Sequence, residues 1–467
     1  MSIDYQDFIA DKRKKLQPTG FNPIGELNSN LFDWQATIVD WALRRGRAAL
    51  FEECGLGKTL QQLAWAEQVV RKTNKPVILH CPVGVRQQTM REAEKFSIGC
   101  EVKICNEASE VINGINLVNY EKIHHFDTSV FAGVVLDESS ILKNALGKTK
   151  RLLVESYQQT PYRLACTATP SPNDHIELGS HAEFLGVCER EDMLSKYFVH
   201  DGSDTSKWRL RGHAVKHFWE WVASWAVCLS KPSDIAGSDD GFDLPKLNVQ
   251  RHMVSVDQTS PVEGLLFNVS GISATTIHEE KRLTCNARCD KVAELVTGKT
   301  DPVVIWCDTN YESDALMERL PDAVEIRGTH SEKAKETMLS AFADGEAKTL
   351  ITKPSVAGFG MNWQHCNHQV FAGLSYSFEA YYQAVRRCWR FGQKRPVTVD
   401  IVLAESESAL QSAVANKESD HRLMQAEMAN AMKSATMKEI GLDKGKAVYE
   451  VGESINLPSF LGEVTCK

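Results

Sequence analysis

The sequence predicts an α/β protein with two parallel-sheet domains in tandem and a mainly helical insertion between them. Short apolar runs alternate with longer amphipathic stretches in two separate series along the 467 residues. Alternation of strand-like and helix-like segments favours parallel sheets that are covered by helices. At roughly 150 residues per domain, a chain of this length has room for two or three domains.

The two series have similar length and the same order of elements. In the first, strands are predicted at 48–51, 77–79, 115–118, 134–136 and 163–166, with helices at 59–72 and 85–96. In the second, strands are predicted at 303–306, 324–326, 349–352, 369–371 and 397–402, with helices at 311–319, 331–343 and 378–390. Each series therefore predicts one α/β domain.

The segment between the series differs in composition. It carries Trp208, Trp219, Trp221 and Trp225, followed by a turn-rich stretch at 237–245 and a strand-like stretch near 247–256. The tryptophans are expected to be core aromatics, with stacking on bases or gripping of DNA as the alternative. We expect a helical extension at 1–30, a first α/β domain at 31–184, a helical insertion and crossover at 185–290, a second α/β domain at 291–404 and a helical tail at 405–467.

Composition limits the classes of function. Hydrophobic residues make up 43% and charged residues 24%, with a formal net charge of −8, so a nucleic-acid contact would need a local basic groove. The thirteen cysteines are an odd number and are scattered, which favours a reducing compartment. Without a signal-peptide pattern or a long apolar run, we expect a soluble cytoplasmic protein with no membrane contact.

A candidate phosphate loop follows the first predicted strand. Glycines at 55 and 57 would let backbone N–H groups turn towards phosphates, and the following helix adds its positive end. Lys58 would reach the β- and γ-phosphates, and the Thr59 hydroxyl would bind Mg²⁺. The strict motif fails at Glu52, where the pattern requires glycine. A glycine-containing turn with a chance Gly-Lys-Thr remains the alternative.

Two adjacent carboxylates, Asp137 and Glu138, end the strand predicted at 134–136. Next to a phosphate loop, Asp137 would hold Mg²⁺ as a Walker-type aspartate, and Glu138 would orient or deprotonate the attacking water. A solvated Asp-Glu pair at a strand end is the ordinary alternative for such a sequence on its own. Thr167 and Thr169 follow one further strand, either between the nucleotide and the second domain or in a simple turn.

The second domain has no phosphate loop but contains an arginine-rich stretch at 383–393. Arg387 and Arg390 are three residues apart, so we expect them on one face of the helix predicted at 378–390. A guanidinium suits a γ-phosphate across an interdomain cleft, and a solvated basic helix face is the alternative.

Together these segments resemble the motor of superfamily-two helicases, in particular its Swi/Snf-like branch of DNA translocases. The resemblance is carried by Leu31–Gln35, Glu53–Thr59, His80–Val83, Val118–Glu121, Asp137–Asn144, Thr167–Asn173, Gly328–Ser331, Gly358–Asn362 and Gln383–Gln393. It implies two RecA-like domains that hold ATP and Mg²⁺ between them. The compact chain resembles phage- or prophage-encoded members.

The resemblance also implies roles for individual residues. It places Gln35 at the adenine and Gly55, Gly57 and Gly360 at the nucleotide. The residues expected to contact nucleic acid are Pro82, Asn119, Lys143 and Thr329, and those expected to couple the domains are Thr167, Thr169 and Gln383. Ser140 replaces the usual histidine of the acidic box, so the coupling of hydrolysis to DNA is expected to differ.

These expectations combine into one hypothesis with two alternatives. The chain is expected to hydrolyse ATP with Lys58, Asp137, Glu138, Arg387 and Arg390 and to move on double-stranded DNA. A helicase that separates DNA or RNA strands, and so acts on single-stranded DNA or RNA, is the first alternative. A nucleotide-locked DNA clamp or adaptor is the second. We expect a monomer, with 185–290 as the candidate surface for a protein partner.

Overall fold

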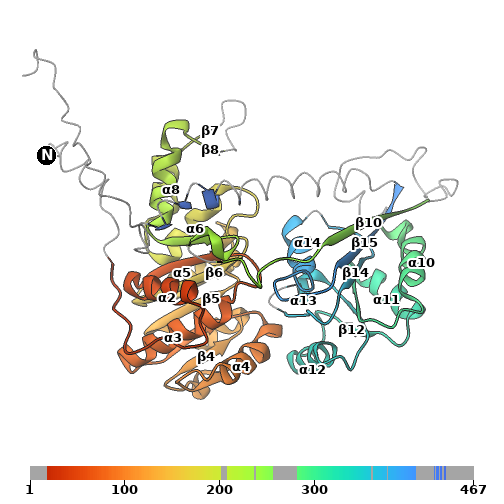
Figure 1. The fold of residues 1–467 in the computed structure, drawn as a ribbon, viewed down its shortest axis with the longest axis horizontal. Helices are drawn as coiled ribbons and strands as arrows, with labels where there is room; N and C mark the ends of the chain where they lie inside the picture. The colour runs from red at the N-terminus through yellow and green to blue at the C-terminus, as the bar shows by residue number, and fades with distance from the viewer. Residues whose placement is uncertain are drawn as a thin grey trace, which may run out of the picture.

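The computed structural model describes residues 18–200, 208–235, 238–255, 281–358, 361–375 and 377–405, and a few positions between 425 and 437. Two α/β lobes lie next to each other in Figure 1, the first coloured red to green and the second green to blue. The chain crosses from the first lobe to the second just before β10 (Leu247–Val254), which runs away from the first lobe. Among the described residues, every helix falls short of the length and apolar character needed to span a membrane.

The first lobe is a seven-stranded parallel sheet in the order β3-β4-β2-β5-β6-β1-β9. Its strands are β1 (Arg47–Glu52), β2 (Val77–His80), β3 (Val102–Ile104), β4 (Ile115–Val118), β5 (Gly133–Asp137), β6 (Tyr162–Thr167) and β9 (Ala226–Leu229). Its helices are α2 (Asp33–Arg45), α3 (Lys58–Thr73), α4 (Arg86–Lys95), α5 (Lys148–Ser156), α6 (Leu178–Leu185), α7 (Arg190–Tyr197) and α8 (Val215–Ala223).

Both faces of this sheet are buried. Ala48 and Leu50 of β1 belong to one apolar cluster, and Ala49 and Phe51 belong to another. Successive side chains of a strand point to opposite faces, so each face has its own core. A parallel sheet that is covered on both faces explains why its strands are nearly continuous apolar runs in the sequence.

The second lobe is a six-stranded parallel sheet in the order β10-β15-β14-β11-β13-β12. Its strands are β10 (Leu247–Val254), β11 (Val303–Trp306), β12 (Val324–Ile326), β13 (Thr349–Thr352), β14 (His368–Phe371) and β15 (Val397–Ala404). Its helices are α10 (Cys285–Val296), α11 (Asn310–Arg319), α12 (Glu332–Ala343), α13 (Pro354–Ala357) and α14 (Phe378–Val385). The two tandem parallel sheets confirm the predicted fold class.

The segment expected as an insertion at 185–290 is shared between the lobes. Strand β9 pairs with β1 in the first sheet, and β10 pairs with β15 in the second. Among the described strands of this segment, those of the antiparallel hairpin, β7 (Phe198–His200) and β8 (Trp208–Leu210), stand apart from both sheets. Trp219 and Trp225 are buried core residues, as expected. Residues 18–32 contain no helix, and residues 1–17 lie outside the described part of the chain.

The described pieces of the C-terminal segment return to the first lobe. Met428 and Met432 are buried in the same cluster as Phe218 of α8. The Gln425 amide donates to the carbonyl oxygen of Ala168 at 3.2 Å. The chain therefore leaves the second lobe at β15 and packs again on the first.

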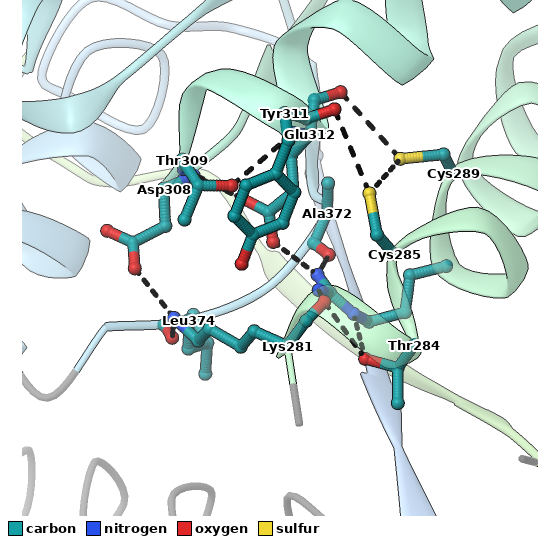
Figure 2. Close-up of polar contacts among 11 residues, drawn as sticks. Lys281, Thr284, Cys285, Cys289, Asp308, Thr309, Tyr311, Glu312, Ala372 and Leu374 are labelled. Carbon is teal, nitrogen blue, oxygen red and sulfur yellow. Dashed lines mark hydrogen bonds and ion pairs between the residues drawn. The ribbon is translucent and has the colours of Figure 1, made fainter. Parts of the chain in front are cut away.

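A buried ion pair ties α10 to α11 and to the end of β14 in the second lobe. The Arg288 guanidinium and the Glu312 carboxylate are both fully buried, 2.7 Å apart. Arg288 also donates to the Thr284 hydroxyl and to the carbonyl oxygen of Lys281, at 3.0 and 2.8 Å. Figure 2 shows Glu312, Thr284 and Lys281 gathered at this ion pair. Glu312 also accepts from the backbone N–H groups of Asp308 and Thr309, at 2.8 and 2.9 Å.

Replacing Arg288 with methionine is expected to destabilise the second lobe by about 3–5 kcal/mol, because Glu312 would remain buried without its counter-charge. The urea unfolding transition measures the effect. Arg319→Met is the matched control, because Arg319 joins the same two helices through the exposed Asp290 at 2.7 Å. The control variant should lose less than about 1 kcal/mol of unfolding free energy. Equal losses of unfolding free energy in the two variants would contradict the prediction.

Candidate active site between the lobes

The loop between β1 and α3 has the backbone of a phosphate-binding loop. Gly55 and Gly57 have φ angles of 93° and 80°, in the left-handed region that side chains disfavour. A Cβ on Gly57 would also lie 2.4 Å from the Gln35 Nε2 atom. The loop therefore needs glycine at 57 for two reasons. It leads directly into the N-terminus of α3, which is a position where anions bind.

Gln35 is fixed against this loop. Its Nε2 donates to the Leu56 carbonyl oxygen at 2.8 Å, and its Oε1 accepts from the Phe32 N–H at 3.0 Å. An amide nitrogen carries two hydrogens and an amide oxygen two lone pairs, so each end has a second bonding position. A donor and an acceptor side by side suit the N7 and N6 atoms of adenine.

Lys58 begins α3, and its Nζ donates to the carbonyl oxygens of Glu52 and Glu53 at 2.6 and 3.1 Å. The ammonium group therefore lies over the loop, where a phosphate would be cradled. Thr59 follows on the same turn of α3. With Asp137 it offers a hydroxyl and a carboxylate oxygen, which are ligands that Mg²⁺ accepts, so these residues fit the metal.

The acidic pair lies at the C-terminal end of β5, in the middle of the sheet. Asp137 accepts from the Gln62 amide of α3 at 2.8 Å, and its backbone carbonyl accepts from the Tyr120 hydroxyl at 2.7 Å. Glu138 has a φ of 59° although it is not glycine. Such a backbone costs about 1–2 kcal/mol, and strain of this kind is characteristic of functional sites.

Burial changes the acidity of both carboxyls. Desolvation, and then the neighbouring charge of Asp137, raise the pKa of Glu138 to about 7. Desolvation also raises the pKa of Asp137, against the opposing effects of Gln62, Lys58 and Arg387. A carboxylate whose pKa lies near neutrality is suited to accept a proton from water.

A chain of hydrogen bonds connects Glu138 to the second lobe. The Thr167 hydroxyl donates to Glu138 Oε2 at 3.4 Å and accepts from the Thr169 N–H at 3.1 Å. The Gln383 amide donates to the Thr169 hydroxyl at 3.3 Å, and Arg387 donates to Gln383 Oε1 at 2.9 Å. The structure thus brings together the three residues expected to couple the domains.

The arginines do not lie on a regular helix, contrary to the sequence expectation. Helix α14 ends at Val385, whose carbonyl oxygen accepts from the Gln369 amide at 2.9 Å, and the next residues form tighter turns. Arg387 and Arg390 nevertheless converge, because each donates to the Met361 carbonyl oxygen at 3.2 Å. Burial and the nearby charge of Arg387 lower the pKa of Arg390 to about 10.

Sequence reasoning missed the residues that join the phosphate loop to the second lobe. Arg386 lies 3.2 Å from Glu53 Oε1 and donates to the Cys54 carbonyl oxygen at 2.9 Å. The Tyr382 hydroxyl donates to Glu53 Oε2. Gly55 packs against Phe391, since a Cβ there would lie 3.1 Å from that ring. The sequence signal for this contact was the adjacent pair Arg386 and Arg387, of which only Arg387 was expected at the site.

The residues expected to contact nucleic acid have varied surroundings. Thr329 is exposed, Pro82 is half-buried, and Asn119 is buried with its Oδ1 accepting from the Glu121 N–H at 3.4 Å. The Lys143 ammonium donates to Glu379 of α14, so it forms an ion pair between the lobes here. Glu379 also accepts from the Thr169 hydroxyl at 3.2 Å. Gly360 lies outside the described residues.

Comparisons with known proteins agree with this geometry. Residues 34–193 match the SNF2-related domain, and residues 287–392 match the helicase conserved C-terminal domain. An uncharacterized ATP-dependent helicase of Bacillus subtilis is 24% identical over 401 residues, covering 76% of this chain and 71% of that protein. The DNA annealing helicase and endonuclease ZRANB3 of Mus musculus is 21% identical over 437 residues, covering 85% of this chain.

The chain spans only 39% of that mouse relative. Among solved structures, the SWI2/SNF2 ATPase core of Sulfolobus solfataricus in complex with dsDNA has a TM-score of 0.41 and 18% identity, covering 91% of this chain and 99% of that one. The two family models together cover the phosphate loop, the acidic pair and both arginines. The chain is therefore an ATP-hydrolysing, helicase-like enzyme of superfamily two that belongs to its Swi/Snf-like branch.

Proposed function

We propose that this enzyme uses ATP hydrolysis between its lobes to translocate on double-stranded DNA. The observation that carries the proposal is the hydrogen-bond chain from Glu138 to Arg387, because it makes the hydrolytic group and the second lobe one connected unit. A change at the γ-phosphate would then alter how the lobes contact each other. The mouse relative named a DNA annealing helicase supports DNA as the track.

Each side chain at the site has a distinct role in the proposed reaction. Gln35 would read the adenine, and the loop from Gly55 to Lys58 would bind the phosphates. Thr59 and Asp137 would hold Mg²⁺, which neutralises charge on the β- and γ-phosphates when bound. Arg387 and Arg390 would reach the γ-phosphate from the second lobe.

Glu138 would start the reaction as a general base. Its carboxylate takes a proton from a water molecule, whose oxygen attacks the γ-phosphorus. The bond between the γ-phosphorus and the bridging oxygen of ADP breaks, and the electron pair stays on ADP. Lys58 and the arginines stabilise the negative charge that is spread over the phosphoryl oxygens in the transition state.

Release of phosphate would then loosen the contacts between the lobes. Arg387 loses the anion that it binds, so its bond to Gln383 and the hydrogen-bond chain from Gln383 to Thr169 can break and re-form with the next ATP. Repeated closing and opening of two lobes that both grip one DNA strand would move them along the duplex.

Steady-state ATP hydrolysis tests the proposal when it is measured without nucleic acid, with duplex DNA, with single-stranded DNA and with RNA. The variant Glu138→Gln is the inactive control. We expect strong stimulation by duplex DNA and displacement of a third strand from a triplex. Stimulation by single strands or RNA alone would favour a strand-separating helicase. A rate no higher than that of Glu138→Gln under every condition would favour a clamp or adaptor and contradict the motor.

The rate of hydrolysis is also expected to depend on pH. Because the pKa of Glu138 is raised to about 7, its basic form is lost as the pH falls below that value. We expect kcat/KM for ATP to rise with pH through about 7 and then level off. Burial raises the pKa of Glu52 to about 7 as well, so Glu52→Gln is the control. If Glu52→Gln abolished the fall of kcat/KM at low pH, the assignment of that pH dependence to Glu138 would be wrong.

A further inference from the structure

Two cations of the first lobe converge on one point beside the second lobe. The Arg86 guanidinium at the start of α4 and the Lys122 ammonium both donate to Asn106 Oδ1, at 3.2 and 2.8 Å. Arg86 and Lys122 belong to helical segments that follow different strands, β2 and β4, of the same sheet. Convergent cations from separate segments of the chain form the kind of site that binds a phosphate group.

The anions that meet these cations come from the other lobe. Arg86 Nη2 lies 2.8 Å from Glu332 and 3.0 Å from Glu336, and Lys122 Nζ lies 3.3 Å from Glu332. In the part of the chain that the structure describes, no carboxylate of the first lobe forms an ion pair with either cation. The first lobe alone therefore presents positive charge that an external anion must balance.

The acidic groups form one stripe of the second lobe. Glu332 and Glu336 are four residues apart on α12, so they share a helix face. Asp344, just beyond the helix, continues the series and lies 3.5 Å from Arg91 of α4. Helices α4 and α12 lie side by side at the lower edge of Figure 1, where the lobes meet.

This contact is electrostatic and incompletely packed. A cavity of about 230 Å³ remains between α4 and α12, lined by polar side chains such as Gln87 and Gln88 and by apolar ones such as Leu339 and Met361. The Arg86 side chain is only 3% exposed, yet its Nε has no hydrogen-bond partner among the described residues. Burial opposes ionisation of Glu332, but Arg86 and Lys122 hold the pKa of its carboxyl below the ordinary value.

We propose that Arg86 and Lys122 bind a phosphate of the DNA backbone, and that Glu332 and Glu336 occupy this site when DNA is absent. The inference rests on the proposed function and adds to it a competition between the DNA phosphate and the two carboxylates for the same cations. Carboxylate oxygens and phosphate oxygens accept the same hydrogen bonds from a guanidinium. A duplex must therefore separate α12 from α4 before it can bind there, so DNA binding is linked to opening of this side of the cleft.

Duplex binding without nucleotide, measured by fluorescence anisotropy over a range of salt concentrations, tests the competition. The variant Glu332→Gln/Glu336→Gln should bind duplex on the order of tenfold more tightly than the wild type. The control Glu318→Gln/Glu346→Gln removes the same charge from exposed positions of the second lobe and should change affinity much less.

The cation variant should act in the opposite direction. Arg86→Gln/Lys122→Gln should bind more weakly and reduce the slope of log K against log salt by about two, one for each cation lost. Small-angle scattering without DNA should show more open lobes in both the acidic and the cation variants, and no opening in the control. If the Arg86 variant fails to fold, Lys122→Gln alone should lower the slope by about one.

The outcomes separate this inference from the proposed function. A wild-type protein that binds DNA, with neither variant differing from the control, would overturn the phosphate site alone. Tighter binding by the acidic variant without opening of the lobes would also overturn it, because simple charge removal would then explain the affinity. A wild-type protein that binds no nucleic acid would contradict the proposed function and this site together.

Discussion

Replacing Arg387 with lysine should lower kcat for ATP hydrolysis about 10³-fold, in line with the effect of arginines that stabilise phosphoryl transfer. Lysine keeps the charge but donates from one nitrogen only. Arg387 uses three nitrogens at once, with Nε donating to the Gln383 carbonyl oxygen at 2.8 Å, Nη2 to the Gln383 amide oxygen and Nη1 to Met361. These bonds aim its charge towards the acidic pair.

Phosphate release at saturating ATP measures this effect, and KM for ATP should change much less than kcat. Arg395→Lys is the matched control, because Arg395 lies in the same lobe, is 43% exposed and pairs with the surface residue Asp301. It should retain most of the activity. A loss below tenfold in Arg387→Lys would show that Arg387 does not stabilise the transition state, and would leave Arg390 as the remaining candidate.

The first sheet shows what the sequence could predict about the fold. Its central strands are apolar runs that are buried on both faces, so each is visible without knowledge of its neighbours. Strand β9 was missed although Ala226–Leu229 is apolar, because it directly follows a helix rich in aromatic residues and has no turn signal before it. Only its pairing with β1 defines it as a strand.

The residues of the site also divide into those that a local sequence pattern identifies and those that only the folded chain brings together. The phosphate loop and the acidic pair are local patterns, in which the order of residues within one turn defines the chemistry. The contacts between the lobes are not local: Lys143 and Glu379 are 236 residues apart, and Arg86 and Glu332 are 246 apart. A charged residue that pairs over such a separation looks like any solvated charge in the sequence. Lys143 was therefore assigned to nucleic acid on resemblance alone.

Replacing Glu138 with glutamine should lower kcat by about 10²–10⁴-fold, the usual contribution of a general base. Glutamine has the same shape, can still accept from Thr167 and places no new demand on the left-handed backbone at this position. It cannot take a proton from water. Nucleotide binding should be retained, because Lys58, Thr59 and Asp137 are unchanged.

Single-turnover hydrolysis and binding of a fluorescent nucleotide measure the two halves of this prediction. Glu53→Gln is an informative comparison, because Glu53 is a nearby carboxylate that contacts Arg386 and Tyr382 of the second lobe. It should weaken contact between the lobes while leaving the base in place, so the acid limb of its pH profile should persist. If Glu138→Gln retained the chemical step while Glu53→Gln lost it, the general base would have to be reassigned to Glu53.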